Sequence, residues 1–202
     1  MRIAALATGV GNVRSVVRAL ARSVPVGRTI VTADPDEVRR ADVLVVPGQG
    51  SFGAFAAALD AAGLREAIGD KVRSGAPYLG ICLGLQVLFD ESDEAPGARG
   101  LGVFRGRVRR LAPGADAPLP HMGWNRAERA KPSAVLESAH YYFAHTYAAA
   151  PADASIVLAT TTYGGETFAS AIEDGAIVGV QFHPEKSQRA GLDLVERFFR
   201  TL

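Results

Sequence analysis

The sequence predicts an α/β protein with an open, mostly parallel, doubly wound sheet and with antiparallel additions in its second half. Two observations predict this fold. Over the first ninety residues, short all-apolar segments alternate with helical patterns, as in a parallel sheet that is covered on both faces. From about residue 97 onward, strand-like segments follow one another closely and mostly lack helices between them.

The first half is expected to alternate strand and helix, with a loop rich in glycine and proline near its middle. In order, the expected elements are a strand over 3–7, a helix over 12–22, a strand over 28–32, a short helix near Asp36, a strand over 43–46, the loop 47–53, an alanine-rich helical stretch over 54–75 and a strand over 77–81.

The second half is expected to add short strands separated by turn residues. They cover 103–111, 141–147, 154–164, 167–175 and 176–183, and a terminal helix follows over 188–199. We expect the last strand and the terminal helix to return to the parallel core. No internal repeat or long linker interrupts the chain, so we expect a single domain over residues 1–202.

The composition is that of an ordinary soluble globular protein: 48% of the 202 residues are hydrophobic, and 22 Lys and Arg balance 21 Asp and Glu. This balance does not indicate a nucleic-acid or membrane surface. The single cysteine cannot form an internal disulfide, which favours a reducing, cytoplasmic location. An apolar run near the start meets Gly9 too early for a secretory signal, and no apolar run of membrane-spanning length follows.

That cysteine, Cys82, lies between Gly80 and Gly84 where an apolar strand changes into a helical pattern. The spacing is that of a nucleophile elbow, G-x-S-x-G, with cysteine in place of serine. A thiol at this turn faces a helix N-terminus, whose free N–H groups favour a thiolate and a developing oxyanion. Gln86 would stand on the same helix face. A buried, inert cysteine is the alternative; a second elbow around Ser51 fails because position 49 is Gln.

A cysteine nucleophile needs a base, and the base needs an orienting group. His183 ends the last apolar strand, and Glu185 lies two residues on, so both share a face if the strand continues. Pro184 favours an extended His183. A structural histidine is the alternative, and His121, His140 and His145 could compete, although none of these three has a carboxylate two residues away.

These motifs resemble those of a known family. "GICLGLQ" (80–86) and "QFHPEKS" (181–187) are similar to the nucleophile and His-Glu motifs of the class I glutamine amidotransferases. Three further stretches, "GNVRSVVRAL", "HMGWN" and "YYFAHTY", narrow the resemblance to the glutaminases of imidazole glycerol phosphate synthases in histidine biosynthesis. The resemblance covers essentially the whole chain.

The resemblance implies a Cys-His-Glu glutaminase that needs no metal or cofactor. Cys82 would attack the glutamine carboxamide, His183 would protonate the departing ammonia, and Glu185 would orient His183. The oxyanion hole would combine the Leu83 N–H with one from the loop at Gln49 and Gly50, after a peptide rotates. The implied substrate-binding residues are Gln86, Glu94, Thr146 and Tyr147.

Spacing alone would not select Glu94. A straight helix would carry it about 18 Å from Cys82, and it otherwise reads as one member of a solvated acidic run.

The resemblance also implies a partner, a (β/α)8-barrel cyclase subunit that receives the ammonia. Residues that match its docking surface are Asn12, Trp124, Tyr142 and Lys186. For Trp124 the alternative is an aromatic core anchor. The sequence departs from the family at Ala7 and Thr8, where Asp and Tyr are usual, and at Gln49, where Val is usual. Neither departure touches the triad.

Other functions are weaker. "GVGN" (9–12) could begin a dinucleotide site, but Arg14 replaces its third glycine. Alternating arginines at 105, 107, 109 and 110 could bind phosphate, although a solvated edge strand explains them better. The glutaminase of another amidotransferase, such as that of pyridoxal phosphate synthesis, is a rival, and so is a non-catalytic module that only docks and regulates a partner.

Overall fold

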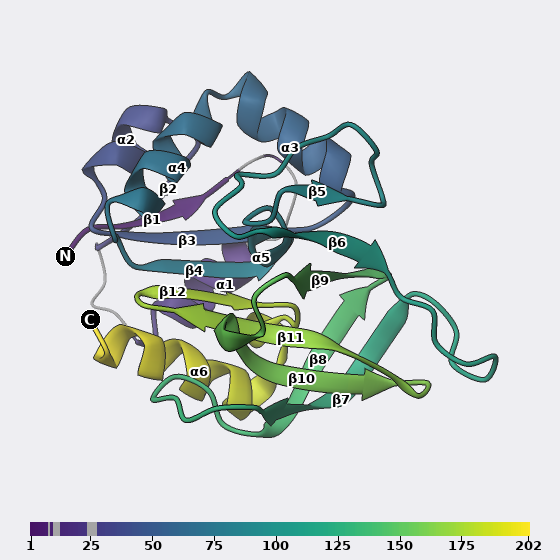
Figure 1. Ribbon diagram of the computed structural model, residues 1–202. Coiled ribbons are helices and arrows are strands. Elements are labelled where there is room, and N and C mark those ends of the chain that lie inside the picture. The colour runs from purple at the N-terminus through teal and green to yellow at the C-terminus, as the bar shows by residue number, and fades with distance from the viewer. Residues whose placement is uncertain (8, 10–12, 24–27) are drawn as a thin grey trace.

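A computed structural model describes residues 1–7, 9, 13–23 and 28–202 (Figure 1). Its main sheet has nine strands in the order β2-β1-β3-β4-β12-β11-β10-β7-β8. The first five of these are parallel, and the remaining pairs are antiparallel. The predicted fold class is therefore confirmed.

The strands of this sheet are, in chain order, β1 Ile3–Leu6, β2 Thr29–Thr32, β3 Val43–Gly48, β4 Tyr78–Cys82, β7 His121–Arg129, β8 Ala139–His145, β10 Val157–Tyr163, β11 Glu166–Asp174 and β12 Ile177–Val180. A second sheet holds β5 Glu91–Ser92, β6 Gly106–Arg110 and β9 Tyr147–Pro151. The strands β1, β3, β4 and β12 are buried throughout, as expected for a sheet covered on both faces.

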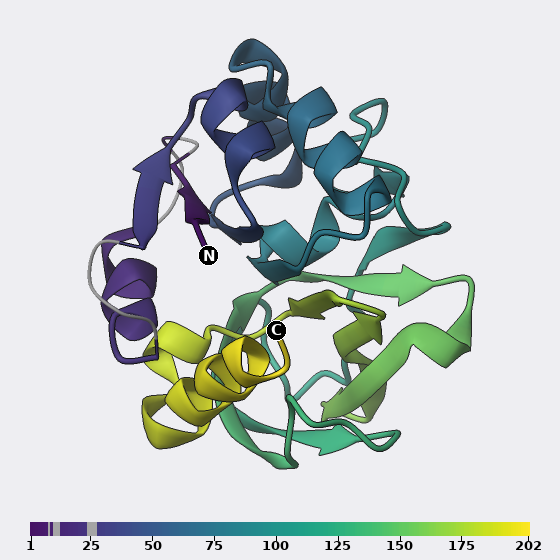
Figure 2. The same ribbon diagram turned by 90° about the vertical axis from the view of Figure 1, so that its left-hand side faces the viewer.

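The helices are α1 Val13–Leu20, α2 Pro35–Arg40, α3 Phe52–Ala61, α4 Leu64–Arg73, α5 Leu83–Gln86 and α6 Gln188–Arg200, with short 3₁₀ helices η1 Ala154–Ile156 and η2 Pro184–Lys186. Figures 1 and 2 show α2, α3 and α4 on one face of the parallel strands and α1 beside α6 on the other. Two hydrophobic clusters fill these two layers. None of the helices in the described ranges is long and apolar enough to cross a membrane.

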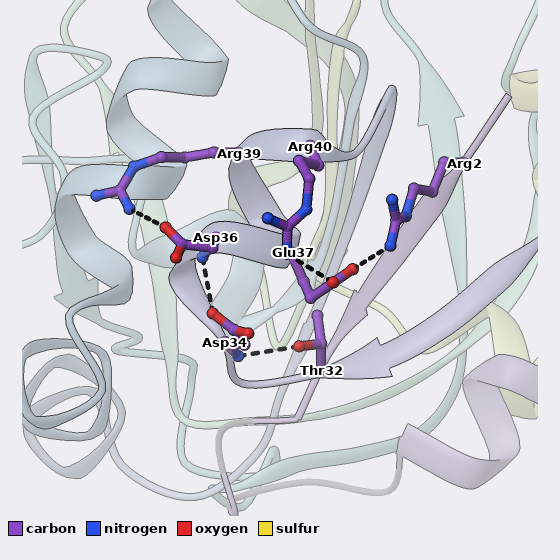
Figure 3. A network of polar contacts seen from close by, with 7 residues as sticks. All are labelled: Arg2, Thr32, Asp34, Asp36, Glu37, Arg39 and Arg40. Atoms are coloured by element: carbon purple, nitrogen blue, oxygen red, sulfur yellow. Dashed lines mark hydrogen bonds and ion pairs between the residues drawn. The ribbon is translucent and has the colours of Figure 1, made fainter.

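The short helix expected near Asp36 is α2, and polar contacts define its start (Figure 3). The Asp34 side chain accepts a hydrogen bond from the Asp36 N–H at 2.8 Å, which satisfies a free donor of the first turn. Pro35 fits the first helical position because it has no N–H to satisfy. Glu37 pairs with Arg40 on the same helix and with Arg2 at the start of the chain, which ties α2 to β1.

Two expectations for the first half were wrong in detail. The stretch 54–75 forms two helices, because Gly63 adopts the left-handed conformation (φ +65°) and turns the chain between α3 and α4. The loop 47–53 is shorter than expected, because β3 continues to Gly48 beside Cys82 of β4 and α3 begins at Phe52.

Three expectations for the second half were also wrong. The stretch 141–147 is not one strand: β8 ends at His145, and Tyr147 begins β9 in the other sheet. The arginine-rich strand β6 lies between β5 and β9 rather than at an edge. The last strand ends at Val180, short of His183. The strand β7, which contains "HMGWN", was not among the expected elements.

Candidate active site

The nucleophile elbow forms where β4 turns into α5. Cys82 has φ 55° and ψ −106°, a backbone conformation that residues other than glycine rarely adopt. A Cβ on Gly84 would lie 1.8 Å from the Val46 carbonyl oxygen, and one on Gly80 would lie 2.5 Å from the Gly84 oxygen. Both glycines are therefore required for close backbone packing, and they hold Cys82 at the sharp turn.

His183 lies beyond the end of β12 and is held by β8. Its N–H donates to the Tyr142 carbonyl at 2.8 Å. The Ser187 hydroxyl donates to the His183 carbonyl at 2.6 Å and accepts from the Tyr142 N–H at 2.9 Å. The expected contact with Glu185 is present: His183 Nδ1 lies 2.9 Å from Glu185 Oε1.

The reason expected for that contact was wrong. The strand does not continue through Glu185, because Pro184 begins the 3₁₀ helix η2. His183 itself is extended (φ −103°, ψ 95°), and the tight turn after it brings the carboxylate back to the ring. Both side chains are nearly inaccessible to solvent.

The charges at the site favour a protonated imidazole. Burial lowers the pKa of His183, but interactions with Cys82 and Glu185 outweigh burial and raise that pKa from 6.5 to about 9. Because a carboxylate only accepts, the His183 Nδ1–H donates to Glu185, which leaves Nε2 for the thiol of Cys82.

A pocket of about 330 Å³ opens in front of Cys82 and His183. It lies at the carboxyl edge of the parallel strands β4 and β12, where open α/β sheets place their sites. Its lining includes all the predicted substrate-binding and oxyanion residues: Gln49, Gly50, Leu83, Gln86, Glu94, Thr146 and Tyr147. Lys186 and three residues that were not predicted, Pro120, Ala144 and His145, complete the lining.

Gln86 is fixed by two hydrogen bonds. Its amide nitrogen donates to the Tyr147 carbonyl at 2.9 Å and to Gln181 Oε1 at 3.0 Å. Both amide hydrogens are therefore used within the protein, and only the oxygen can contact a ligand.

Gln181 was missed in the sequence analysis. It is fully buried, and its amide nitrogen donates to the sulfur of Cys82 at 3.6 Å. One signal was present: Gln181 is a polar residue that directly follows the apolar strand β12 at its carboxyl edge, next to the His183 motif.

Glu94 reaches the pocket because α5 is only one turn long. The chain then folds back through β5, so the straight-helix estimate does not apply. Glu94 Oε2 accepts from the Phe52 N–H at 2.7 Å, at the start of α3. The acidic residue thus joins the substrate pocket to the segment that follows Gln49 and Gly50.

The loop between β3 and α3 faces the elbow. A Cβ on Gly48 would lie 2.6 Å from the Cβ of Leu83, so the loop and the start of α5 are in close contact. Gly50 has φ +94°, which glycine adopts at little cost.

The predicted docking residues that the structure describes gather on β7, β8 and η2. The Trp124 ring packs edge-on against Tyr142 at 6.2 Å, and the Lys186 ammonium lies 5.6 Å from the Tyr142 ring centre. Trp124 is 47% exposed and neighbouring Met122 is 62% exposed, so the alternative of a core anchor was wrong. Asn12 and Thr8 lie outside the described residues.

The three histidines that could compete with His183 as the catalytic base form no hydrogen bond with Glu185 in the described part of the chain. His140 is exposed, whereas His121 and His145 are buried and lie 3.0 Å apart between Nδ1 and Nε2. Two of the three arginines of β6 have acidic partners: Arg109 pairs with Glu166, and Arg107 lies 3.8 Å from Asp93.

Comparison with known proteins finds a match to the family model of class-I glutamine amidotransferases over residues 8–202. The chain is similar to proteins named imidazole glycerol phosphate synthase subunit HisH. It is 41% identical to that of Pyrococcus furiosus, with 98% of each chain covered, and 46% identical to that of Methanothermobacter thermautotrophicus, with 97% of this chain and 96% of the relative covered. The Aquifex aeolicus protein is 44% identical, with 99% and 97% covered.

Solved structures share the fold. A glutamine amidotransferase crystal structure matches with a TM-score of 0.76 at 21% identity, covering 98% of this chain and 97% of the other. The structure of PurLQS from Thermotoga maritima matches with a TM-score of 0.71 at 16% identity, covering 99% and 96%.

Proposed function

The chain belongs to the class I glutamine amidotransferase family, and we propose that within it this protein is the glutaminase subunit of an imidazole glycerol phosphate synthase. It hydrolyses glutamine to glutamate and ammonia and delivers the ammonia to a cyclase subunit in histidine biosynthesis. The observation that carries this proposal is the buried His183–Glu185 pair beside Cys82 in a pocket at the sheet edge.

In the first half of the reaction, the Cys82 thiol gives its proton to His183 Nε2, and the resulting thiolate attacks the carboxamide carbon of glutamine. The C–N bond breaks as His183 gives its proton to the leaving ammonia, and a glutamyl thioester remains on Cys82. The raised pKa of His183 suits this step, because the ring holds a proton at neutral pH. Glu185 stabilises the charged ring and keeps Nε2 turned toward the reacting atoms.

In the second half, water attacks the thioester carbon. His183, now neutral, takes a proton from that water, the C–S bond breaks, and glutamate leaves. Every group that this cycle requires is a side chain or backbone donor of the chain itself.

Two acceptors are suited to the substrate's ammonium group. Gln86 can offer only its oxygen, since its amide hydrogens are used by Tyr147 and Gln181. Glu94 Oε2 accepts from Phe52, so Oε1 is the oxygen that we assign to the substrate. Thr146 and Tyr147 line the same pocket beside them. This arrangement supports recognition of an amino acid rather than a simple amide.

The developing oxyanion is assigned to the Leu83 N–H and to a donor from the Gln49–Gly50 peptide. Leu83 is the first residue of α5, where backbone N–H groups have no partner within the helix. We expect the second donor to turn into place only when the partner binds its own ligand. The left-handed conformation of Gly50 makes such a rotation sterically accessible.

The partner surface is proposed to include Trp124, Tyr142 and Lys186, with Asn12. An exposed tryptophan beside a second aromatic ring is typical of an interface anchor. Lys186 also lines the pocket, so it lies between the reacting centre and the proposed docking surface. Binding of the partner at this surface can therefore change the position of Lys186 in the active-site pocket.

We also propose that residues 1–202 form one glutaminase domain and that it works in the cytoplasm. The continuous nine-stranded sheet supports the first point. The second rests on the lone cysteine, which must stay a free thiol to react.

The test is glutamate release with and without a cyclase barrel subunit. We expect the complex to release glutamate and the isolated chain to do so roughly 100-fold more slowly, the cost of one missing oxyanion donor. Cys82→Ala should abolish release while still binding the partner. Release by Cys82→Ala at the wild-type rate would exclude the enzyme proposed here. A wild-type chain that binds the partner but releases no glutamate would be a non-catalytic docking module. Failure to bind a cyclase barrel would favour the glutaminase of another amidotransferase.

A further inference from the structure

A hydrogen-bonded chain begins on β7, next to the proposed docking surface. Asn125 Nδ2 lies 3.2 Å from His121 Nε2 and 3.0 Å from the Thr162 carbonyl. His121 Nδ1 lies 3.0 Å from His145 Nε2, and His145 Nδ1 lies 2.9 Å from the Tyr147 carbonyl. Both histidines are buried.

The chain continues from that carbonyl to the nucleophile. The same Tyr147 oxygen accepts from Gln86 at 2.9 Å, and the other hydrogen of that amide goes to Gln181 at 3.0 Å. Gln181 in turn donates to the Cys82 sulfur at 3.6 Å. The contacts therefore run without a gap from β7 to the reacting thiol.

The direction of each bond follows from the groups at its ends. The Tyr147 carbonyl only accepts, so His145 carries its proton on Nδ1, and its Nε2 accepts. His121 must then donate from Nδ1, and its own Nε2 accepts from the Asn125 amide. Every polar atom of the two rings is satisfied in this one arrangement, provided that both rings are neutral.

Burial keeps the rings neutral. It lowers the pKa of His121 to about 4 and that of His145 to about 3, while the Tyr147 carbonyl opposes the change at His145. His121 also stacks between Phe143 and Tyr163, at centroid distances of 4.7 and 4.1 Å, so its ring cannot turn freely.

We propose that His121 and His145 are positioning residues for Cys82: with Asn125 they fix the Tyr147 carbonyl, and through Gln86 and Gln181 they hold a donor against the Cys82 sulfur. This inference rests on the proposed function, since it concerns how the glutaminase nucleophile is held. The same hydrogen-bonded chain connects Cys82 to β7. A partner that binds β7 can therefore change how firmly Gln181 is held against the Cys82 sulfur.

Two substitutions of His121 separate this role from simple packing. His121→Phe keeps the ring stacking but removes the donor to His145, whereas His121→Asn loses the stacking but keeps a donor near the position of Nδ1. In the complex with the cyclase subunit, we expect His121→Phe to lower kcat roughly tenfold with little change in KM. We expect His121→Asn to restore most of that loss.

A second readout does not depend on the partner or on glutamine. Iodoacetamide modifies only Cys82, the single cysteine, so its rate on the isolated chain reports the reactivity of that thiol. The rate should fall severalfold in His121→Phe and recover in His121→Asn. Phe168→Leu is the matched control: Phe168 packs against both histidines but makes no bond in the chain, and both readouts should stay near wild type.

The proton arrangement can be measured without any substitution. Nitrogen-15 NMR of the wild-type rings at pH 7 should show both histidines neutral and protonated on Nδ1. A charged ring or an Nε2 proton on either one would overturn the proposal, and so would wild-type kcat and alkylation in His121→Phe. If wild type releases no glutamate at all, the proposed function fails, and alkylation with NMR still decides the positioning role.

Discussion

At the scale of single residues, the site depends on how Cys82 is held. Its left-handed backbone costs about 1–3 kcal/mol relative to an ordinary conformation. A buried hydrogen bond helps to offset this cost: the Tyr78 hydroxyl donates to the Gly84 carbonyl at 2.7 Å and stabilises the turn. Cys82 is buried, with 6% of its surface exposed, and at this turn it also lines the pocket.

The His183–Glu185 pair leads to a prediction about pH. His183 keeps its proton through neutral pH and loses it only as the pH rises through about 9, because interactions with Cys82 and Glu185 outweigh burial. In Glu185→Gln the negative partner is gone while burial remains, so the ring should lose its proton at a lower pH. NMR titration of the His183 ring measures the midpoint directly.

A matched control is Glu128→Gln, which removes a carboxylate from an exposed ion pair with Arg126. It should leave the His183 midpoint unchanged. An unchanged midpoint in Glu185→Gln would show that the carboxylate does not stabilise the charged ring, contrary to the mechanism.

At the scale of elements, the site is a product of sheet order. The strands β4 and β12 are parallel neighbours, with Ile81 paired to Val180, although the two lie about a hundred residues apart in sequence. Because parallel strands present their carboxyl ends at one edge, the residues that follow them meet there. Cys82 and His183 are brought together by this pairing.

The packing of the elbow against β3 leads to a second prediction. A methyl group on Gly84 would overlap the backbone oxygen of Val46, which belongs to the central strand β3 and cannot move without disturbing the sheet. Gly84→Ala should therefore lower the free energy of unfolding by about 3 kcal/mol or more and misplace Cys82. Denaturant unfolding and the iodoacetamide rate measure the two effects.

Gly69→Ala serves as the comparison for Gly84→Ala. Gly69 lies within α4, and a methyl group there would meet only the far end of the flexible Arg73 side chain. Because alanine favours helix more than glycine does, this variant should be neutral or more stable by up to about 1 kcal/mol. Equal unfolding curves for the two variants would refute the close-packing explanation.

At the scale of the whole molecule, the two ends of the large sheet differ in the side chains that they expose. The strand β2 forms one end, and β7 and β8 form the other, where Trp124 and Met122 are exposed. Figure 1 shows the smaller sheet, with β6 and β9, on the same side of the molecule as β7 and β8. The pocket lies where the parallel strands, the second sheet and β8 approach each other.

This asymmetry predicts which surface residues matter for assembly. Trp124→Ala should weaken binding of the cyclase subunit by about 2 kcal/mol, or roughly 30-fold in Kd, as for an aromatic interface anchor. Val31→Ala removes an exposed apolar side chain from β2 at the opposite end of the sheet and should not change Kd. Calorimetric titration compares the two. Equal Kd values for both variants would remove Trp124 from the interface.

The sequence by itself determined the fold class and the residues of the proposed triad. Both depend on local signals: apolar runs that alternate with helical patterns, glycines around Cys82, and a carboxylate two residues after His183. Such signals are readable because neighbouring residues must satisfy the same local geometry. The turn that joins His183 to Glu185 was not predicted from the sequence. An extended strand and a tight turn would each place these two side chains on the same side, so the spacing of two residues does not distinguish them.

Only the tertiary structure decided what surrounds the triad. The placement of Glu94 against Phe52, the approach of Gln181 to the sulfur, and the chain through His121 and His145 join segments that are far apart in sequence. The entry of β7 into the main sheet and the separation of β8 from β9 depend on which strands pair. Pairing is decided by packing of the whole chain, which no local pattern of apolar and polar residues records.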